Sequence, residues 1–254
     1  MTNMIHAFEH WMLNYRRVWV GTIFSGFVMP ILFMVGIGLG VGAYVQDTSS
    51  IGGVSYAAFI APGLLASTAM QITMGEMTWP VFGALRWGAQ YKAMQASPLR
   101  PIDMLNGHLL YGMLRGFISA VVFLVVMVFF GVVSSGWAPL AVIPATLTAF
   151  SLVGLMYAYA VTVDSEIGLS IIQRFVIIPI TLFSGVFFPL TQLPQALQAI
   201  AWISPLWHGA ELSRWAVNGT PTPWFWGVHV LYLLALGAVG WWAAYRRLTI
   251  RLTI

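Results

Sequence analysis

The sequence has very little charge. Only 7% of its 254 residues are Asp, Glu, Lys or Arg, whereas 59% are hydrophobic and the mean hydropathy is +0.85. An ordinary soluble domain carries about 25% charged residues. So few charges could not cover a water-soluble core, and the apolar residues fall in long blocks rather than at periods of 2 or 3.6. The composition therefore predicts one all-α integral membrane domain over residues 1–254.

The sequence lacks the residues or motifs that several kinds of chemistry require. Cysteine is absent, which excludes disulfides, thiolate metal sites and cysteine catalysis. The sequence contains neither a G-x-x-x-x-G-K-[ST] phosphate-binding loop nor a G-x-S-x-G nucleophile elbow. The net charge of +4 does not indicate nucleic-acid binding, because the basic residues lie between apolar blocks and form no patch. A nucleotide-hydrolysing or acyl-transfer enzyme is thus not expected from this chain alone.

Six apolar blocks are long enough to cross a bilayer, which needs about 20 residues at 1.5 Å rise each. A charged stretch, residues 86–103, separates the second block from the third, and a mixed segment, residues 189–223, precedes the last. The expected spans are residues 18–42, 55–85, 105–133, 139–163, 167–188 and 224–245.

The basic residues predict the orientation. Short cytoplasmic loops retain Lys and Arg, so the side that carries them is the inner one. Six crossings place both termini on the same side, and Arg214 alone falls on the other. The ten on the inner side are Arg16, Arg17, Arg86, Lys92, Arg100, Arg115, Arg174, Arg246, Arg247 and Arg251. We therefore expect a multi-pass membrane protein with cytoplasmic N- and C-termini.

Residues 1–17 are amphipathic at helical spacing, which favours a helix in the inner interface plane over an unstructured tail. They also spell H-x-x-E-H from His6 to His10, the pattern of one class of zinc peptidases. No soluble domain is available to build a catalytic pocket around this motif. We interpret it as a polar helix face and assign no metal site.

Two charges, Glu76 and Arg115, lie inside apolar blocks. Charges there are costly and usually pair, face water or snorkel. Both fall near the inner ends of adjacent spans, so the sequence allows either an ion pair or independent snorkelling to the interface.

Four glycines alternate along the end of the first span. Gly36 with Gly40, and Gly38 with Gly42, form small-xxx-small pairs that favour close helix packing. The partner helix could belong to this chain or to a second copy.

The outer segment, residues 189–223, combines prolines with two short amphipathic pieces, residues 196–202 and 206–217. Neither piece can cross a bilayer, and both read as re-entrant or interfacial helices whose backbone is satisfied by protein or water. Five tryptophans at this level form an expected aromatic belt: Trp202, Trp207, Trp215, Trp224 and Trp226.

Three stretches together resemble the permease subunits of the ABC-2 family of ATP-driven exporters. Residues 91–100 (YKAMQASPLR) resemble its cytoplasmic coupling segment, although Lys92 stands where relatives often have Glu. Residues 183–190 (FSGVFFPL), and residues 205–208 (PLWH) with Glu211 and Arg214, resemble its outer signature. The resemblance is strongest to the branch of nodulation-factor, lipo-oligosaccharide and actinobacterial drug exporters.

The resemblance implies a division of labour. A separate ATP-binding cassette subunit would bind ATP and Mg, while two permease chains, identical or paralogous, form the path for an amphipathic lipid-linked saccharide or hydrophobic drug. The implied ATPase-coupling residues are Tyr91, Lys92, Met94, Gln95, Leu99 and Arg100, with the apolar ones as docking anchors. The implied outer-signature residues are Phe188, Pro189, Pro194, Pro205, His208, Glu211 and Arg214.

Two alternatives stay open from the residues themselves. A secondary transporter driven by an ion gradient would normally show inverted repeats and charges at the midplane of its spans, which this sequence lacks. Residues 86–103 could also be a membrane-surface loop whose basic residues touch anionic headgroups instead of an ATPase.

Overall fold

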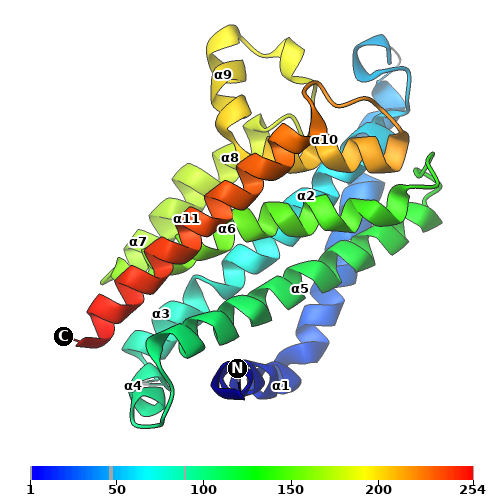
Figure 1. Cartoon of the computed structure of the whole chain (residues 1–254). Coiled ribbons are helices and arrows are strands. Elements are labelled where there is room, and N and C mark those ends of the chain that lie inside the picture. The colour runs from blue at the N-terminus through cyan, green and yellow to red at the C-terminus, as the bar shows by residue number, and fades with distance from the viewer. Residues whose placement is uncertain (1, 46–47, 89, 254) are drawn as a thin grey trace.

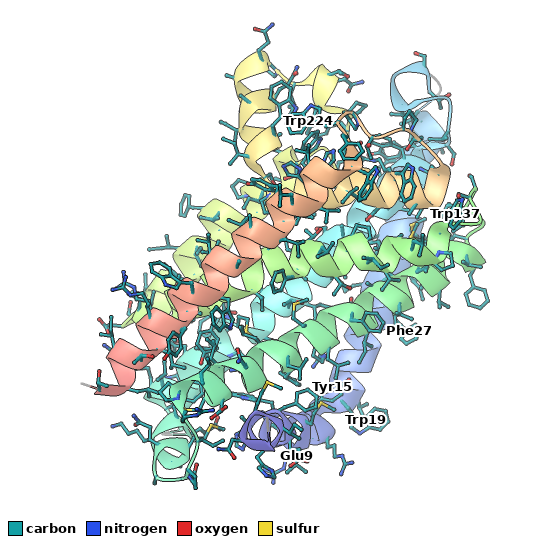
Figure 2. All side chains as sticks on the ribbon, viewed as in Figure 1. Glu9, Tyr15, Trp19, Phe27, Trp137 and Trp224 are labelled. Atoms are coloured by element: carbon teal, nitrogen blue, oxygen red, sulfur yellow. The ribbon has the colours of Figure 1, made fainter. Side chains whose placement is uncertain are left out.

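A computed structural model describes residues 2–45, 48–88 and 90–253, and every regular element among them is helical. Figure 1 shows a bundle of long, mutually inclined helices with short helices at both ends. The N-terminus and α4 lie at one end, and α9 and α10 at the other. Figure 2 likewise places Glu9 at the first end and Trp224 at the second.

Six helical stretches of the described residues are long and apolar enough to cross a membrane, which confirms the all-α, six-span prediction. They agree with the expected blocks except at their ends; the last, for example, continues through the C-terminal arginines. Their bounds are Phe27–Tyr44, Tyr56–Arg86, Pro101–Phe129, Ala138–Thr162, Glu166–Phe183 and Trp226–Thr253.

Most of these spans are built from more than one helix. The first runs from α1 (Thr2–Phe33) through a π-helical stretch (Met34–Gly40) to a 3₁₀ turn (Val41–Tyr44). The second joins α2 (Tyr56–Glu76) to α3 (Trp79–Arg86), and the fifth joins α7 (Glu166–Ile172), a π-helical stretch (Gln173–Ile177) and α8 (Ile178–Phe183). The third is α5 (Pro101–Phe129), the fourth ends in α6 (Val142–Thr162) and the sixth is α11 (Trp226–Thr253).

The break between α2 and α3 follows from local chemistry. The Thr78 hydroxyl donates to the carbonyls of Met74 and Gly75 at 3.2 and 2.9 Å, satisfying groups that the helix end leaves free. Pro80 then stands in the first turn of α3, where its missing N–H costs nothing. The span therefore changes direction without exposing backbone polar groups to lipid.

The second span forms the centre of the bundle. In its most apolar stretch 83% of the residues are buried, against 12% in the first span and 11% in the fifth. The helices α6 and α11 approach closely through glycine: a Cβ added to Gly154 would lie 2.3 Å from the carbonyl carbon of Gly240. In lipid no hydrophobic force drives helices together, because the acyl chains are as apolar as the side chains. Helices therefore associate through close backbone approach at small residues.

The N-terminal residues are helical as expected, but they are continuous with the first span instead of forming a separate helix. Figure 1 shows α1 seen almost end-on near the N-terminus and then turning to rise beside α5. A Cβ added to Gly107 of α5 would lie 2.6 Å from the Ala7 Cβ, so the two helices touch at this point. The N-terminal part of α1 therefore lies across the end of the bundle.

The glycine face of the first span meets little of this chain. A Cβ added to Gly36 would have nothing within 4 Å, and one at Gly40 would approach only the carbonyl oxygen of Val35 in its own turn. Of the three glycines whose surroundings are described, Gly42 is the one that would contact another element, with an added Cβ 3.7 Å from the Tyr56 side chain. Gly38 lies outside the residues whose surroundings the structure describes. No close intrachain helix contact is thus formed at Gly36 or Gly40.

The two outer pieces are α9 (Gln195–Ile203) and α10 (Pro205–Asn218), separated by Ser204. Pro194 precedes α9 and Pro205 opens α10, where a proline ring is preorganised for the first turn. Gly219, with φ of +72°, ends α10 in the left-handed conformation that glycine adopts without strain. The helix α10 is mostly buried, whereas α9 is mostly exposed.

Candidate functional site: the inner coupling region and the outer signature

The coupling segment folds into a short helix, α4 (Gln90–Gln95), between the second and third spans. Tyr91 is fully buried and Met94 is 8% exposed, both inside this chain's own core. The expectation that these two side chains are anchors for a partner is therefore wrong, because they already pack against the bundle. The exposed face of α4 instead carries Lys92, Ala93 and Gln95.

A chain of buried polar groups explains why Tyr91 points inward. The Tyr157 hydroxyl of α6 donates to the Tyr91 hydroxyl at 2.8 Å, and that hydroxyl lies 2.8 Å from His108 Nδ1 of α5. Since Tyr91 accepts from Tyr157, its own proton is available to Nδ1, and we assign the imidazole hydrogen to Nε2, which has no hydrogen-bond partner among the described residues. Burial raises the pKa of Tyr91 well above its usual value, so the phenol stays protonated.

Trp11 of α1 closes this polar chain from the N-terminal side. Its indole stacks on the His108 ring with centroids 3.6 Å apart and planes 18° from parallel. Four elements, α1, α4, α5 and α6, thus meet at one buried cluster. We call Trp11, Tyr91, His108 and Tyr157 the inner aromatic cluster. This cluster holds α4 against the bundle through hydrogen bonds and aromatic stacking, so the segment is a packed helix and not a flexible loop.

The other predicted coupling residues lie at the rim of α4. The Gln95 side chain donates to the Leu252 carbonyl of α11 at 2.8 Å, which links α4 to the C-terminal helix. Arg100 caps α5 together with Asp103, whose carboxylate accepts from the Arg100 Nε at 3.1 Å. Leu99 is half-buried against the core. Lys92 is exposed, and it alone among the predicted polar coupling residues makes no side-chain hydrogen bond or ion pair within the described part of the chain.

Glu76 and Arg115 meet inside the bundle. The Arg115 Nη1 lies 3.0 Å from Glu76 Oε1, with side chains 10% and 18% exposed. The Arg115 guanidinium also stacks over the Tyr15 ring at 4.5 Å and donates to the Tyr111 hydroxyl at 3.3 Å. A pair in this setting satisfies both charges away from water. The contribution of the pair to transport stays a prediction.

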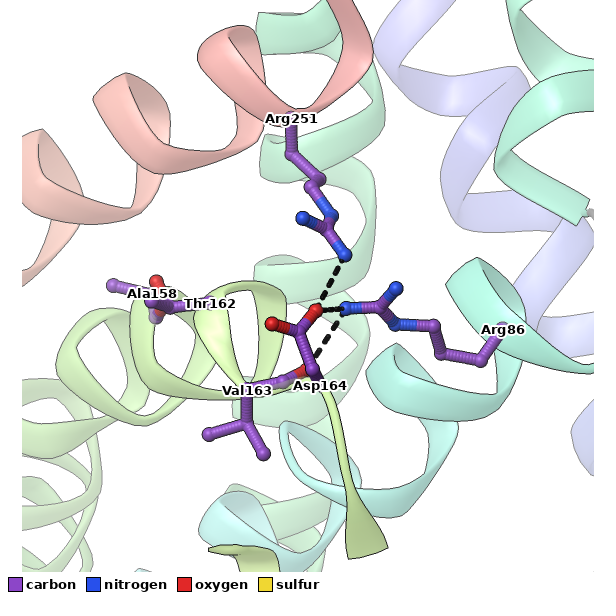
Figure 3. Close-up of polar contacts among 6 residues, drawn as sticks. All are labelled: Arg86, Ala158, Thr162, Val163, Asp164 and Arg251. Atoms are coloured by element: carbon purple, nitrogen blue, oxygen red, sulfur yellow. Dashed lines mark hydrogen bonds and ion pairs between the residues drawn. The ribbon is translucent and has the colours of Figure 1, made fainter. Parts of the chain in front are cut away.

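Asp164, at the connection between the fourth and fifth spans, bridges two arginines on the same end of the bundle. Figure 3 shows Arg86 from α3 and Arg251 from α11 converging on one carboxylate oxygen, the latter at 2.8 Å. Arg86 also donates to the Val163 carbonyl at 3.2 Å. The hydrogen bond from Arg86, and then that from Arg251, lowers the pKa of Asp164 below its usual value. The bridge therefore ties α3 and the end of α11 to the connection between the fourth and fifth spans.

At the outer end, Arg214 of α10 organises the signature segment. Its guanidinium bonds Glu211 at 2.7 Å, the Gly185 carbonyl at 2.5 Å and the Phe59 carbonyl at 3.2 Å. It also stacks over the Phe59 ring at 4.1 Å. The carbonyls around Gly185 have no helical partners, because Gly185 takes a φ of +71° and residues 184–189 are irregular. Arg214 thus satisfies backbone that lipid could not.

The remaining outer-signature residues surround this arginine. Phe188 and Pro189 lie in the irregular stretch, half-buried. The His208 Nε2 lies 3.0 Å from the Trp202 carbonyl and its Nδ1 lies 2.9 Å from the His229 Nδ1, which makes His208 the acceptor from His229. Burial, and then the neighbouring imidazole of His229, lowers the pKa of His208 to about 4. His208 is therefore neutral at physiological pH.

An outer pocket of about 440 Å³ opens beside Arg214. Its walls come from α9, α10, the loops that flank them, the connection before α2 and Phe59 of α2, and they combine indole rings with polar groups. The rings of Trp207 and Trp224 lie 4.8 Å apart, and those of Trp202 and Trp224 lie 6.0 Å apart. The polar groups include Gln198, Glu211 and Asn218. This composition suits a ligand with both apolar faces and hydrogen-bonding groups.

The N-terminal H-x-x-E-H residues do not converge. His6 Nδ1 lies 3.2 Å from Glu9 Oε2 on an exposed face, and His10 stacks edge-on against Trp11 instead. Among the described residues no group of three metal-binding side chains comes together.

Sequence reasoning missed Trp11, Tyr157 and Asp164. Tyr157 is one aromatic residue in an apolar span, and nothing local marks its partner 66 positions earlier. The sequence marks Asp164 only as a polar point between two spans. Its position opposite Arg86 and Arg251 depends on how three helix ends come together.

Comparison with known proteins gives consistent matches. The family model described as ABC-2 type transporter matches residues 7–218. Nodulation protein J of Rhizobium leguminosarum bv. viciae is 30% identical over 219 residues, covering 83% of this chain and 82% of the relative. Nodulation protein J of Neorhizobium galegae is 28% identical, with 88% and 84% covered. The inner membrane transport permease YadH of Escherichia coli (strain K12) is 26% identical, with 90% and 89% covered.

Proposed function

Because the chain belongs to the ABC-2 type transporter family, we propose that it is the membrane-spanning subunit of an exporter driven by a separate ATP-binding cassette subunit. ATP and Mg are bound by that partner, and the present chain supplies the path. The observation that carries this proposal is the family match over residues 7–218, together with six apolar helices. The same match favours this function over a transporter driven by an ion gradient.

The docking element of the proposed mechanism is α4. Its exposed residues Lys92 and Ala93 make no side-chain hydrogen bond within the described part of the chain and are available to a groove on the ATPase, whereas the exposed Gln95 is already bonded to Leu252 of α11. Its buried Tyr91 belongs to the inner aromatic cluster, so a displacement of α4 acts on α1, α5 and α6 at once. Coupling therefore divides α4 into two faces, one for the partner and one for the bundle.

A second permease chain is the partner that the first and fifth spans favour. They are the least buried spans, with 12% and 11% of their most apolar stretches covered. Gly36, where an added Cβ would have nothing within 4 Å, and the exposed Ile167 and Phe175 supply apolar surface on these spans. Small residues at such a surface let backbones approach in lipid. We propose that a second copy or a paralogue packs there.

The proposed location is a bacterial inner membrane with the α4 end in the cytoplasm. This orientation is supported by ten basic residues on the α4 side against Arg214 on the other. Reporter fusions test it: those at Ser49 and Gly219 should report outside, and those at Gln95 and Ile254 inside. A cytoplasmic signal from the Gly219 fusion would overturn both the orientation and the six-span order.

The proposed substrate class is an amphipathic lipid-linked saccharide or hydrophobic drug, moved outward. The outer pocket supports an amphipathic ligand, because its indoles offer apolar faces while Glu211 and Asn218 offer hydrogen bonds. The test is uptake of a labelled glycolipid, or of a hydrophobic dye, into inverted vesicles that contain both subunits. Uptake should require ATP and survive a protonophore that collapses the ion gradient. Uptake abolished by the protonophore with ATP still present would instead assign an ion-driven transporter.

A further inference from the structure

A basic cleft opens at the inner end of the bundle, between α3 and α4 on one side and the end of α11 on the other. Its volume is about 680 Å³. We call it the inner basic cleft. Its lining includes Leu85, Arg86, Lys92, Gln95, Arg251 and Leu252.

The charges of the cleft do not cancel. Arg86, Lys92 and Arg251 supply three positive charges, while Asp164, which pairs with both arginines, supplies one negative charge. The arginine side chains are 28% and 33% exposed, so they can still reach a ligand. Both use Nη2 for Asp164, and Arg86 Nη2 also donates to the Val163 carbonyl, while the Nε and Nη1 groups of both arginines have no hydrogen bond within the described residues. The cleft thus presents an excess of two positive charges with unused donors.

The position of the cleft relates it to the membrane surface. Arg86 ends the second span and Arg251 lies in the last turn of the sixth. The apolar side chains of Leu85 and Leu252 line the same cleft. Basic pockets between transmembrane helices on the cytoplasmic side are where anionic headgroups bind, because the phosphate meets cations while the acyl chains stay in the bilayer.

From these observations we propose that the inner basic cleft is a binding site for the phosphate group of an anionic lipid headgroup. Lys92 and Gln95 line the cleft and also belong to the exposed face of α4. A bound phosphate therefore neutralises Lys92 and joins α4 to α11 next to the proposed ATPase surface. Lipid composition would then set how firmly α4 is held when the ATPase docks. A free phosphate or pyrophosphate shares the same chemistry and is the other source to test.

The inference rests on the inner position of the cleft proposed above, but its test requires no ATPase. The full chain, purified in neutral detergent, is titrated with phosphatidylglycerol, phosphatidylcholine or inorganic pyrophosphate, and the apparent dissociation constant is read from the thermal unfolding shift. The cleft variant is Lys92→Gln with Arg251→Gln. The matched control is Arg16→Gln with Arg174→Gln, two exposed arginines on the same side and outside the cleft.

The expected result is tight binding of phosphatidylglycerol, weakened about fivefold for each basic residue lost and so about 25-fold in the cleft variant. The control pair should bind as the unaltered chain does. Asp164→Asn, which removes the competing carboxylate, should bind about fivefold more tightly, a gain that damage to the fold would not produce.

The outcomes separate the sources. A response to phosphatidylglycerol and not to pyrophosphate assigns the site to bilayer lipid, and a response to pyrophosphate alone assigns it to a free phosphate. Equal weakening in the cleft and control variants would mean general surface charge and would overturn the proposal. Unchanged binding in Lys92→Gln together with no gain in Asp164→Asn would also overturn it, even if the double variant failed to fold. A failed ATPase assay would leave this result untouched.

Discussion

The hydrogen-bond directions in the inner aromatic cluster predict which of its substitutions destabilises the fold more. Tyr157→Phe removes one donor and leaves Tyr91 still bonded to His108. Tyr91→Phe leaves two buried groups without a partner, the Tyr157 O–H and the His108 Nδ1. A lost hydrogen bond costs about 1 kcal/mol, and each buried group left unsatisfied costs about 1–3 kcal/mol. We therefore expect about 1 kcal/mol for Tyr157→Phe and about 2–6 kcal/mol for Tyr91→Phe.

The double variant gives the sharper result. With both hydroxyls gone, the unsatisfied Tyr157 O–H is gone too, so the double change should cost less than the sum of the two single changes. The free energy of unfolding of the purified chain, measured by denaturant titration in detergent, checks this. An equal or smaller loss in Tyr91→Phe than in Tyr157→Phe, or strictly additive losses, would refute the hydrogen-bond order from Tyr157 through Tyr91 to His108.

Function should follow the same order. If the cluster transmits the movement of α4, Tyr91→Phe loosens α4 from α5 and α6 while leaving the exposed face of α4 unchanged. The variant complex should keep its ATPase subunit and hydrolyse ATP, but move less substrate per ATP hydrolysed. A transport ratio equal to that of the unaltered complex would show that the cluster only stabilises the fold.

Three further predictions concern other parts of the chain. Neutralising either Glu76 or Arg115 should cost about 3–5 kcal/mol of folding free energy and lower the folded yield, while exchanging the two residues recovers part of it; strict additivity in a double-mutant cycle would contradict the contact. The lowered pKa of Asp164 means that its bridge stabilises the fold at neutral pH and that this stabilisation is lost as pH falls through that pKa. The unfolding curves of the unaltered chain and Asp164→Asn should therefore differ at pH 7 and converge below about pH 4. Convergence already at pH 6 would be inconsistent with this. Gly154→Ala should cost about 1–3 kcal/mol of folding free energy, because its Cβ would lie 2.3 Å from the α11 backbone. Gly36→Ala, with open space around the added methyl group, should unfold like the unaltered chain. Equal effects of the two substitutions would argue against the α6–α11 contact.

Hydropathy and proline positions predicted most of the fold. Long apolar blocks indicated the six spans, because a bilayer demands about 20 apolar residues per crossing. The prolines at 194 and 205 indicated the starts of α9 and α10, since each ring suits the first turn of a helix and not its interior. These signals are local, and local signals survive in a single sequence.

The parts that could not be predicted depend on long-range packing. Tyr91 lies in a charged stretch of sequence that is typical of an exposed docking helix. Its burial follows only from its hydrogen bonds with Tyr157 and His108. The alternating glycines near Gly36 indicated close helix packing, yet the close intrachain approach occurs at Gly154 in another span. The Glu76–Arg115 contact was one of two alternatives, because sequence spacing cannot distinguish pairing from snorkelling across two helices.

The central claim is that α4 docks on a separate ATPase through its exposed face. Ala93→Trp places a bulky ring on that face without disturbing the buried cluster, and Ala196→Trp places the same ring on the exposed outer helix α9 as a control. Both variants and the unaltered chain are coexpressed with the ATPase subunit, and the amount of ATPase that copurifies is measured. We predict that the ATPase is retained by the unaltered chain and by Ala196→Trp and is lost from Ala93→Trp. Full recovery of the ATPase with Ala93→Trp would contradict docking at α4, and no recovery with the unaltered chain would contradict the exporter itself.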